Sequence, residues 1–291
     1  MSVTIVITTF NRAGVLRDLL LRLETEEDDD FEVVVAMDGC TDGTEAMLAG
    51  LRTRYPLRWV NTGFSGYGLA LARNRGILAA RADVVAIVDD DSVPVPGFVR
   101  AHRAASRPRC ITGGPRDPHD PDRDPRLAGK MAALRALPAL TPMTVERIER
   151  DHPDAYLVEN NVSMRRADWI ALGLFTERLR IYGVIGQEFF ARVRHAGWHY
   201  QFAPDAGVVH REEIEGDNGL DRARKTRQFR LAGLLRPGLM TPRQYAAQQA
   251  WAEARDRGEC PPAFPPWWPH AAGTLGRRAL RRATRGFGRG G

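Results

Sequence analysis

The chain has 291 residues, of which 43% are hydrophobic and 27% are charged, a composition typical of a globular protein long enough to bury a sizeable core. Its net charge of +6 equals the six arginines of residues 277–291, so the remaining chain is neutral, which argues against nucleic-acid binding. Three isolated cysteines, no signal-peptide pattern and no apolar run of about 18 residues favour a cytoplasmic protein without a membrane span.

The first hundred residues alternate between two patterns. Short apolar runs predict strands at residues 3–9, 31–37, 57–61 and 84–88, and apolar side chains at helical spacing predict helices near 15–23, 45–54 and 66–80. We expect the acidic run at residues 24–30 to be a solvated connection. Strands that alternate with helices in this way predict a mainly parallel sheet.

The pattern changes after Gly114. Residues 115–126 hold four prolines and no large apolar side chain, so they are predicted to form a mobile surface loop. Further strands are predicted at residues 156–164, 199–203 and 207–210, and further helices at residues 127–137, 144–150, 166–172, 187–196, 220–235 and 241–255. A linker rich in proline and tryptophan (261–270) precedes the arginine-rich tail.

Three consecutive aspartates, Asp89, Asp90 and Asp91, follow the apolar run at residues 84–88. Unpaired carboxylates are too costly to bury, so we expect them to emerge at the carboxyl end of that strand, where open α/β sheets bind ligands. Like charges this close repel unless a cation lies among them, and hard oxygen ligands suit Mg²⁺ or Mn²⁺ together with phosphates. The alternative is an acidic turn without a ligand.

Six segments, in this order and spacing, together resemble inverting GT-A glycosyltransferases of family 2: VTIVITTFNRAGVLRDLLLRL, VVVAMDGCTDGT, ARNRGI, VVAIVDDDSVP, NNVSMRRADW and DAGVVH. The resemblance covers residues 2–210. It implies an α/β GT-A fold, Rossmann-like, in which a mainly parallel sheet is flanked by helices and followed by a C-terminal helical extension. Residues 1–114 would then be the nucleotide-sugar-binding half, 115–215 the acceptor and catalytic half, 216–260 the extension, and 261–291 the linker and tail.

The resemblance also implies an activity, the transfer of a hexosyl or N-acetylhexosaminyl group from a nucleoside-diphosphate sugar to a hydroxyl acceptor such as a glycan, a glycolipid or a small molecule. UDP is the carrier that it favours, although dTDP would also suit Asp38, because a carboxylate there can accept a hydrogen bond from a pyrimidine N3–H. Without the resemblance, Asp38 reads as a turn residue that caps the next helix. The donor-binding residues implied are Thr8, Thr9, Asn11, Asp38, Arg73, Asp89, Asp90 and Asn161.

By the same resemblance, Asp91 and His210 would ligate Mn²⁺ or Mg²⁺, which bridges the two phosphates of the donor. Imidazole is an acceptable ligand for Mn²⁺. The alternative for His210 is a surface histidine near the end of a strand. Asn161 would instead be structural if its side chain bonds the backbone.

The general base is where the sequence departs from the family pattern. An inverting transfer needs a carboxylate to accept the proton of the acceptor hydroxyl. The family places a Glu-Asp pair ahead of a motif that Arg192 and Gly197 match here, but an ungapped count puts Ile185 and Gly186 at the pair. A shift of two residues makes Glu188 the predicted base, with Glu159 in reserve; a structural glutamate in the first turn of a helix is the alternative.

Two other functions stay open. Without the Glu-Asp pair, the chain is also readable as a non-catalytic or degenerate nucleotide-sugar-binding protein. The basic tail and Trp267-Trp268 are compatible with peripheral membrane contact at the inner face and a lipid-linked acceptor.

Overall fold

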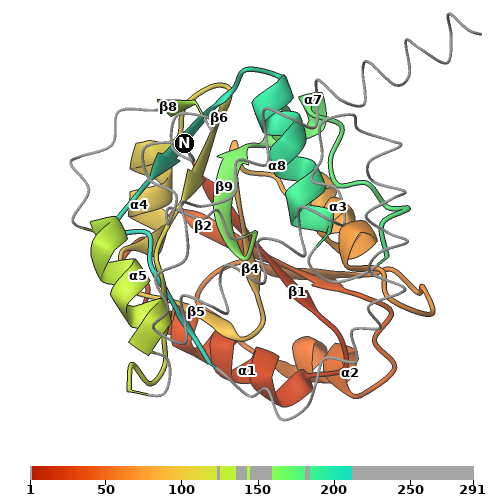
Figure 1. Cartoon of the computed structure of the whole chain (residues 1–291). Coiled ribbons are helices and arrows are strands. Elements are labelled where there is room, and N and C mark those ends of the chain that lie inside the picture. Colours follow the sequence, from red (N-terminus) through yellow and green to blue (C-terminus); the bar gives the residue numbers. More distant parts are fainter. Residues whose placement is uncertain (1, 123–124, 136–142, 145–158, 181–183, 212–291) are drawn as a thin grey trace, which may run out of the picture. The chain divides into compact units, whose positions relative to one another are not determined.

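The computed structural model describes residues 2–122, 125–135, 143–144, 159–180 and 184–211 (Figure 1). The chain divides into two compact units, residues 1–180 with 193–217 and residues 181–192 with 218–291, which are considered separately below. The helices predicted at 144–150, 220–235 and 241–255, the first residues of the strand predicted at 156–164, the linker and the arginine-rich tail lie outside the described residues.

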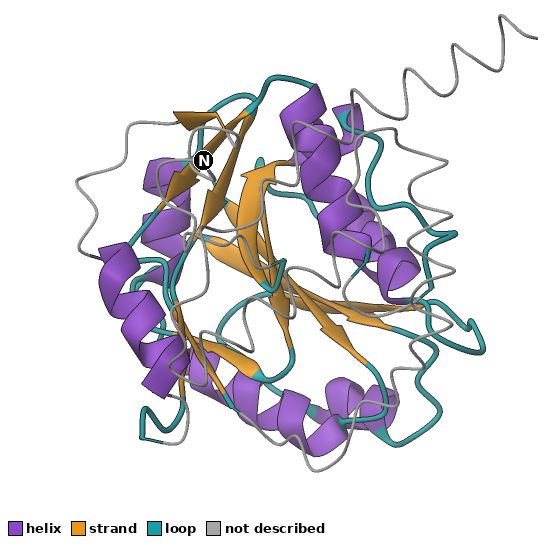
Figure 2. Ribbon diagram, viewed as in Figure 1, coloured by secondary structure: helices purple, strands orange, loops and turns teal. Residues whose placement is uncertain are grey.

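The first unit contains a mixed sheet flanked by helices (Figures 1 and 2). In chain order, the elements of this sheet and its helices are β1 (Val3–Thr9), α1 (Ala13–Arg22), the 3-10 turn η1 (Leu23–Thr25), β2 (Phe31–Met37), α2 (Thr44–Gly50), β3 (Leu57–Asn61), α3 (Leu69–Ala79), β4 (Val84–Asp89), α4 (Phe98–Ala105), β6 (Cys110–Gly113), α5 (Pro125–Arg135), β8 (Met143–Thr144), β9 (Asn161–Arg165), α7 (Arg166–Ala171) and β10 (His199–Phe202). A smaller sheet consists of β5 (Ser92–Pro94), β7 (Arg116–Pro118) and β11 (Val208–His210).

The larger sheet has the strand order β3-β2-β1-β4-β9-β6-β10-β8. Its first four strands are parallel, while β9 runs antiparallel to both β4 and β6. Parallel strands place their carboxyl ends at one edge, which is the edge where such sheets bind ligands. The predicted α/β fold with a mainly parallel central sheet and flanking helices is therefore confirmed.

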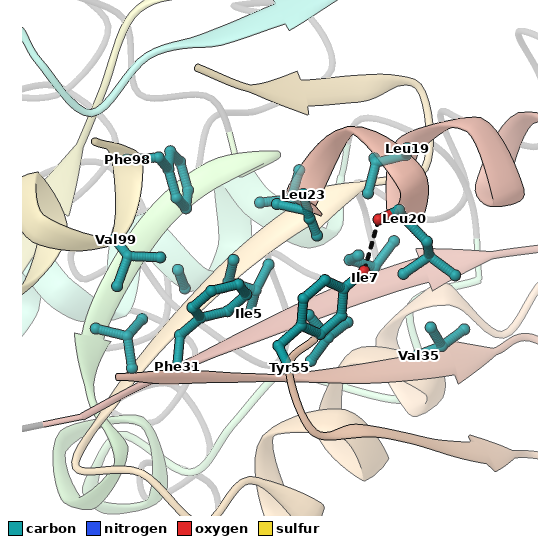
Figure 3. Packing of buried hydrophobic residues seen from close by; sticks show 14 of the residues in the cluster. Ile5, Ile7, Leu19, Leu20, Leu23, Phe31, Val35, Tyr55, Phe98 and Val99 are labelled. Atoms are coloured by element: carbon teal, nitrogen blue, oxygen red, sulfur yellow. Dashed lines mark hydrogen bonds between the residues drawn. The ribbon is translucent and has the colours of Figure 1, made fainter. Parts of the chain in front are cut away.

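The core of this unit lies on both faces of the parallel strands. Odd-numbered residues of β1 and β2, such as Ile5 and Val35, belong to one buried cluster with α1, α2 and α4 (Figure 3). Even-numbered residues face α3, where a Cβ on Gly76 would lie 2.4 Å from the Val6 side chain. Burial of both faces explains why these strands are continuous apolar runs in the sequence.

Residues 24–32 form an acidic cluster at the amino ends of β1 and β2, and its carboxylates are paired. Glu26 Oε1 accepts hydrogen bonds from the backbone N–H groups of Gly97, Glu27 and Asp28 at 3.1 to 3.4 Å. The Asp28 carboxylate pairs with Arg103. Most of residues 24–30 are exposed, as expected of a solvated connection, but Glu26 is buried, and together with Asp28 it ties the sheet to α4.

The prediction that residues 115–126 form a loop is wrong in part. Arg116–Pro118 is strand β7, since it pairs in parallel with β11, and α5 begins at Pro125, where proline is tolerated in a first helical turn. The prolines in this segment argued against a strand, but β7 forms through its pairing with β11 and does not depend on apolar residues of its own. Among the described residues, no helix is long and apolar enough to cross a bilayer.

The described part of the second unit is short. It comprises Val184 and most of α8 (Ile185–His195), whose last residues belong to the first unit. The helix predicted at residues 187–196 is thus confirmed.

Candidate active site at the carboxyl ends of β1 and β4

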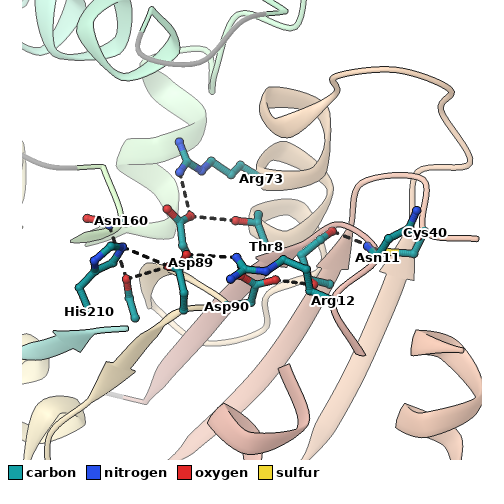
Figure 4. Close-up of polar contacts among 12 residues, drawn as sticks. Thr8, Asn11, Arg12, Cys40, Arg73, Asp89, Asp90, Asn160 and His210 are labelled. Atoms are coloured by element: carbon teal, nitrogen blue, oxygen red, sulfur yellow. Dashed lines mark hydrogen bonds and ion pairs between the residues drawn. The ribbon is translucent and has the colours of Figure 1, made fainter. Parts of the chain in front are cut away.

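The parallel register of β1 and β4 brings two threonines to the aspartate turn (Figure 4). Thr8 lies opposite Asp89, and its hydroxyl donates to Asp89 Oδ1 at 3.1 Å. The Thr9 hydroxyl donates to Asp90 Oδ2 at 2.6 Å. The predicted residues of two strands, 81 positions apart in the chain, therefore form one polar edge.

Asp89 is held by Arg73, which is a fully buried guanidinium. Arg73 Nη2 donates to Asp89 Oδ1 at 3.0 Å, and its Nη1 lies 3.4 Å from Glu159 Oε1. Burial alone would lower the pKa of Arg73, but the two carboxylates outweigh it and raise that pKa above its ordinary value. The arrangement fixes Asp89 at the edge of the sheet, with a third of its side chain exposed.

Asp90 turns inward. Its side chain is buried, and its Oδ1 accepts a hydrogen bond from Arg12 Nη1 at 2.7 Å. Burial raises the pKa of Asp90 to about 7, against the lowering effect of the Thr9 hydroxyl and the Arg12 guanidinium. Thr9 and Arg12 thus hold this carboxylate in a supporting place behind Asp89 and Asp91.

Asp91 meets His210 because of the small sheet. Strand β11 pairs antiparallel with β5 so that His210 lies opposite Ser92, one residue after Asp91. His210 Nε2 lies 3.7 Å from Asp91 Oδ1, while Asp91 Oδ2 accepts a hydrogen bond from Arg12 Nη1 at 3.1 Å. The backbone N–H of Arg211 also donates to the Asp91 carbonyl at 2.8 Å, which fixes the two segments together.

The donor set of Asp91 and His210 fits a divalent ion. Carboxylate oxygen and imidazole nitrogen suit Mn²⁺, and Mg²⁺ is commonly held by one or two carboxylates plus substrate phosphates. Within the described ranges, no group of three or more His, Cys, Asp or Glu side chains is arranged to hold a metal. Asp91 and His210 therefore leave most coordination positions of such an ion to other ligands, and they do not form a closed structural site.

Asp38 directly follows β2, and only one of its two carboxylate oxygens accepts a hydrogen bond from the described chain. Oδ2 accepts a hydrogen bond from the N–H of Gly68 at 2.9 Å, whereas Oδ1 is buried and has no hydrogen-bond partner within the described chain. Burial raises the pKa of Asp38 despite that one bond. A side chain at position 68 would displace this carboxylate, because a Cβ there would lie 2.4 Å from Asp38 Oδ1 and 3.0 Å from the Phe64 ring.

Two more of the predicted donor-binding residues, Asn11 and Asn161, use their side-chain amides in hydrogen bonds to backbone groups. Asn11, which has a φ of 51°, accepts hydrogen bonds through Oδ1 from the N–H groups of Thr41 and Asp42. Asn161 Nδ2 donates to the carbonyls of Pro115 and Ala206 at 2.9 and 2.8 Å. These backbone bonds meet the condition for a structural side chain at Asn161, so its predicted donor contact has no support in the geometry.

The side-chain oxygen of Asn161 contacts a buried histidine. Asn161 Oδ1 lies 3.1 Å from Nε2 of the fully buried His102, and burial lowers the pKa of His102 to about 4. A neutral imidazole between Asn161 and Ser163 supports β9 from behind.

Two further residues lie at this edge: sequence reasoning missed Arg12, and it considered Asn160 only as part of the NNVSMRRADW segment. Arg12 bridges Asp90 and Asp91, although arginine is so common in this chain that its identity alone carried no signal. Asn160 lies beside Ser92, with its Nδ2 3.5 Å from the Ser92 hydroxyl, and its Oδ1 is buried without a partner among the described residues. Its place before β9, opposite the end of β4, is the signal that points to it.

The two candidate bases occupy different units. Glu159 belongs to the first unit and joins the aspartate turn through Arg73. Glu188 belongs to the second, in the first turn of α8, where it is buried and its Oε2 accepts a hydrogen bond from Arg192 Nη2 at 2.9 Å.

Comparison with solved structures defines the class of fold. A fragment of Staphylococcus aureus TarS in complex with UDP-GlcNAc superposes on 80% of this chain and 66% of its own, with a TM-score of 0.57 at 17% identity. A mannosyltransferase from Pyrobaculum calidifontis in complex with GDP-Man and Mn²⁺ covers 97% of this chain and 75% of its own, with a TM-score of 0.55 at 19% identity. The fold is that of GT-A glycosyltransferases.

The family follows from sequence. The profile of Glycosyl transferase family 2 matches residues 4–167, and the chain belongs to that family. A validoxylamine A glucosyltransferase from Streptomyces hygroscopicus is 29% identical over 203 residues, which span 62% of this chain and 48% of that protein. A chondroitin synthase from Escherichia coli is 25% identical over 247 residues, 76% of this chain and 36% of that protein. The chain thus spans half or less of the length of these relatives.

Proposed function

We propose that this chain transfers a sugar from a nucleoside-diphosphate sugar to a hydroxyl acceptor, with inversion at the anomeric carbon and with the help of Mn²⁺ or Mg²⁺. The observation that carries the proposal is the 3.7 Å approach of His210 Nε2 to Asp91 Oδ1, at the sheet edge where Thr8, Arg73 and Asp89 also meet. A strand from the end of the described chain completes a site that begins on β1 and β4. Membership of the family and relatives named as glycosyltransferases support it.

The donor nucleotide binds at the end of β2 in this proposal. The buried Oδ1 of Asp38 is an acceptor that lacks a donor among the described residues, and the N3–H of uracil or thymine would supply one. Leaving such an oxygen unsatisfied costs about 1–3 kcal/mol, so a ligand that donates to it gains in affinity. UDP is the carrier that we favour; proteins of similar fold in complex with UDP-GlcNAc and GDP-Man support a nucleotide-sugar donor as a class.

Asp91 and His210 would hold the divalent ion, with the donor phosphates as its other ligands. A divalent ion bound there neutralises the charge that develops on the nucleoside diphosphate as it leaves. Asp89, fixed by Thr8 and Arg73, faces the ribose side of the donor. The protein thereby orients the donor before any bond breaks, and orientation is itself a large part of catalysis.

In the transfer step, the acceptor oxygen forms a bond to the anomeric carbon while the bond from that carbon to the diphosphate oxygen breaks. The hydroxyl proton passes to a carboxylate, for which Glu188 is our first candidate and Glu159 the second. Glu188 has a hydrogen bond from Arg192, and Glu159 an ion pair with Arg73, so each carboxylate is held in one orientation. Attack opposite the leaving group inverts the anomeric centre.

A screen of UDP-, dTDP- and GDP-sugars, with and without Mn²⁺, tests the donor proposal. Thermal unfolding should shift upward for the correct donor only when Mn²⁺ is present, because a ligand at about 100 times its Kd stabilises by about 2.7 kcal/mol. Release of the nucleoside diphosphate with a panel of acceptors then tests transfer. Binding without turnover across the panel would favour the non-catalytic alternative.

Paired variants separate the two candidate bases. Removing the base should lower kcat by about 10²–10⁴-fold and leave donor affinity unchanged, because the proton moves only in the transfer step. Glu188→Gln and Glu159→Gln should therefore differ, and the variant with the larger loss of kcat identifies the base. Equal turnover of both variants and the unaltered enzyme would exclude both carboxylates.

A further inference from the structure

Arg12 occupies a defined place between two of the three aspartates (Figure 4). It is the N-cap residue of α1, and its carbonyl accepts a hydrogen bond from the Leu16 N–H at 3.0 Å. Its backbone is thus fixed at the junction between β1 and the helix. A single nitrogen, Nη1, reaches Asp90 Oδ1 at 2.7 Å and Asp91 Oδ2 at 3.1 Å.

As a consequence, the two carboxylate oxygens of Asp91 face different partners. Oδ2 faces Arg12, whereas Oδ1 lies 3.7 Å from His210 Nε2 and 3.4 Å from the Ser92 hydroxyl. Without a contact on Oδ2, the carboxylate is able to rotate about its Cβ–Cγ bond. Partners that orient a metal-binding carboxylate from behind typically change metal affinity by about 10–100-fold.

We infer that Arg12 is a positioning residue for the metal site: it holds Asp91 Oδ2 so that Oδ1 faces His210 and the divalent ion. The inference rests on the proposed function, since it assigns a role toward the ion that Asp91 and His210 would bind. Arg12 itself touches neither donor nor acceptor in this role.

Electrostatic repulsion alone predicts the opposite change in metal affinity when Arg12 is removed, and this difference makes the inference testable. If Arg12 only repelled or displaced a divalent cation, its removal would tighten metal binding. However, Arg12 already forms an ion pair with the buried Asp90, so much of its charge is balanced locally, whereas its contact with Asp91 Oδ2 is not duplicated by any other hydrogen bond described for that oxygen. The orienting effect should therefore exceed the charge effect.

The experiment measures Mn²⁺ affinity without donor, from the electron paramagnetic resonance signal of the free ion at neutral pH. Arg12→Gln should bind Mn²⁺ about 10–100-fold more weakly than the unaltered protein. Arg12→Lys should lose less, because an ammonium group also reaches two carboxylates but lacks the planar geometry of guanidinium. Arg58→Gln is the matched control: Arg58 is similarly exposed and pairs with Glu32 at the other end of the strands, so Mn²⁺ affinity should stay the same.

An Arg12→Gln affinity equal to or tighter than that of the unaltered protein would overturn the inference. Thermal unfolding identifies variants that do not fold; if Arg12→Gln is one, Arg12→Lys decides, and undiminished affinity there overturns the inference. Asp91→Asn separates this result from the proposed function. If Asp91→Asn keeps full Mn²⁺ affinity, the metal site itself is misplaced and both ideas fail; if it loses affinity while Arg12→Gln does not, only the inference fails.

Discussion

The sheet carries an acidic cluster at each end of its parallel strands, and the two differ in how their charges are satisfied. At the amino ends, Glu26 accepts three backbone N–H groups, and Asp28 pairs with Arg103. At the carboxyl ends, Asp38 keeps a buried oxygen without a partner in the described chain, and Asp91 directs one oxygen toward a histidine. The first cluster is internally complete, while the second leaves acceptors for a ligand.

The number of acidic residues in a stretch of sequence does not by itself indicate a site. The amino-end run of residues 24–30 is the more acidic of the two, yet arginines and backbone donors use its oxygens. A carboxylate is available to bind a ligand where the fold does not supply a hydrogen-bond donor for each of its two oxygens. Substitutions in the carboxyl-end cluster should therefore lower activity, whereas substitutions in the amino-end cluster should change stability.

The largest effect is expected for Asp91→Asn. Loss of a metal-binding carboxylate should reduce metal-dependent turnover by more than the roughly 10–100-fold that supporting residues cost, with thermal stability nearly unchanged. The matched variant Asp28→Asn should keep full turnover and lose no more than about 1 kcal/mol of stability, because its partner Arg103 is partly exposed. Steady-state kinetics and thermal unfolding of both variants check this. Full activity of Asp91→Asn with the same metal dependence would refute the assignment.

An intermediate effect is expected for Asp38→Asn. The amide retains an oxygen for the Gly68 N–H but turns an NH₂ group toward the position of the pyrimidine N3–H, so UDP affinity should fall about 10–100-fold, in line with hydrogen bonds to charged groups. Cytosine, whose N3 accepts, should be disfavoured less, so the ratio of UDP to CDP affinity should decrease. Calorimetric titration measures both. An unchanged ratio would show that Asp38 does not contact the base.

The pH dependence of UDP binding tests the same residue without a mutation. Burial raises the pKa of Asp38, so acidification should weaken UDP binding at a higher pH than an ordinary aspartate would. Asp38→Asn should remove that component of the pH profile.

The smallest effect is expected at the amino ends, where Glu26 and Glu32 should show opposite signs. Burial raises the pKa of Glu26, so the stability that its titration contributes is present below the unfolded value of 4.5 and is lost as pH rises through its folded pKa. For Glu32, burial is outweighed by the Arg81 N–H and the Arg58 guanidinium, so its pKa is lowered and its contribution is lost as pH falls.

Thermal unfolding of Glu26→Gln and Glu32→Gln across pH 3–8 measures these contributions. Relative to the unaltered protein, Glu26→Gln should gain stability as pH rises above 4.5, whereas Glu32→Gln should lose stability as pH rises from the lowered folded pKa of Glu32 to 4.5 and stay constant above that value. Parallel curves for the two variants would contradict the difference between these carboxylates.

Much of the fold was predictable because strands that are buried on both faces consist of continuous apolar runs, which are recognisable in the sequence. The predicted bounds of β1, β2 and β3 agree with the structure. Strands β5 and β7 were missed because three residues carry no period, and Arg116–Pro118 is polar; pairing with β11 alone makes it a strand. Local sequence does not contain that information.

The site was predictable in position more than in detail. The end of an apolar strand located Asp89 and Asp91, but it could not show that Asp90 turns inward to Arg12. Nor could it distinguish Asn160 from Asn161, because neighbouring residues at a strand point to opposite faces and only the structure shows which one meets His102. The roles of Glu188 and Glu159 as bases stay predictions.

The pairing of β11 with β5 has a consequence for how the protein is made. Asp91 and His210 come from segments 119 positions apart, and His210 reaches Asp91 through a strand of three residues. During synthesis, the aspartate turn emerges from the ribosome well before that strand, so the nascent chain first contains the carboxylates without the imidazole. If an ion binds at this edge as proposed, it gains its imidazole ligand only after residues 208–210 have emerged, since a chain that ends before residue 208 has the aspartate turn but lacks His210.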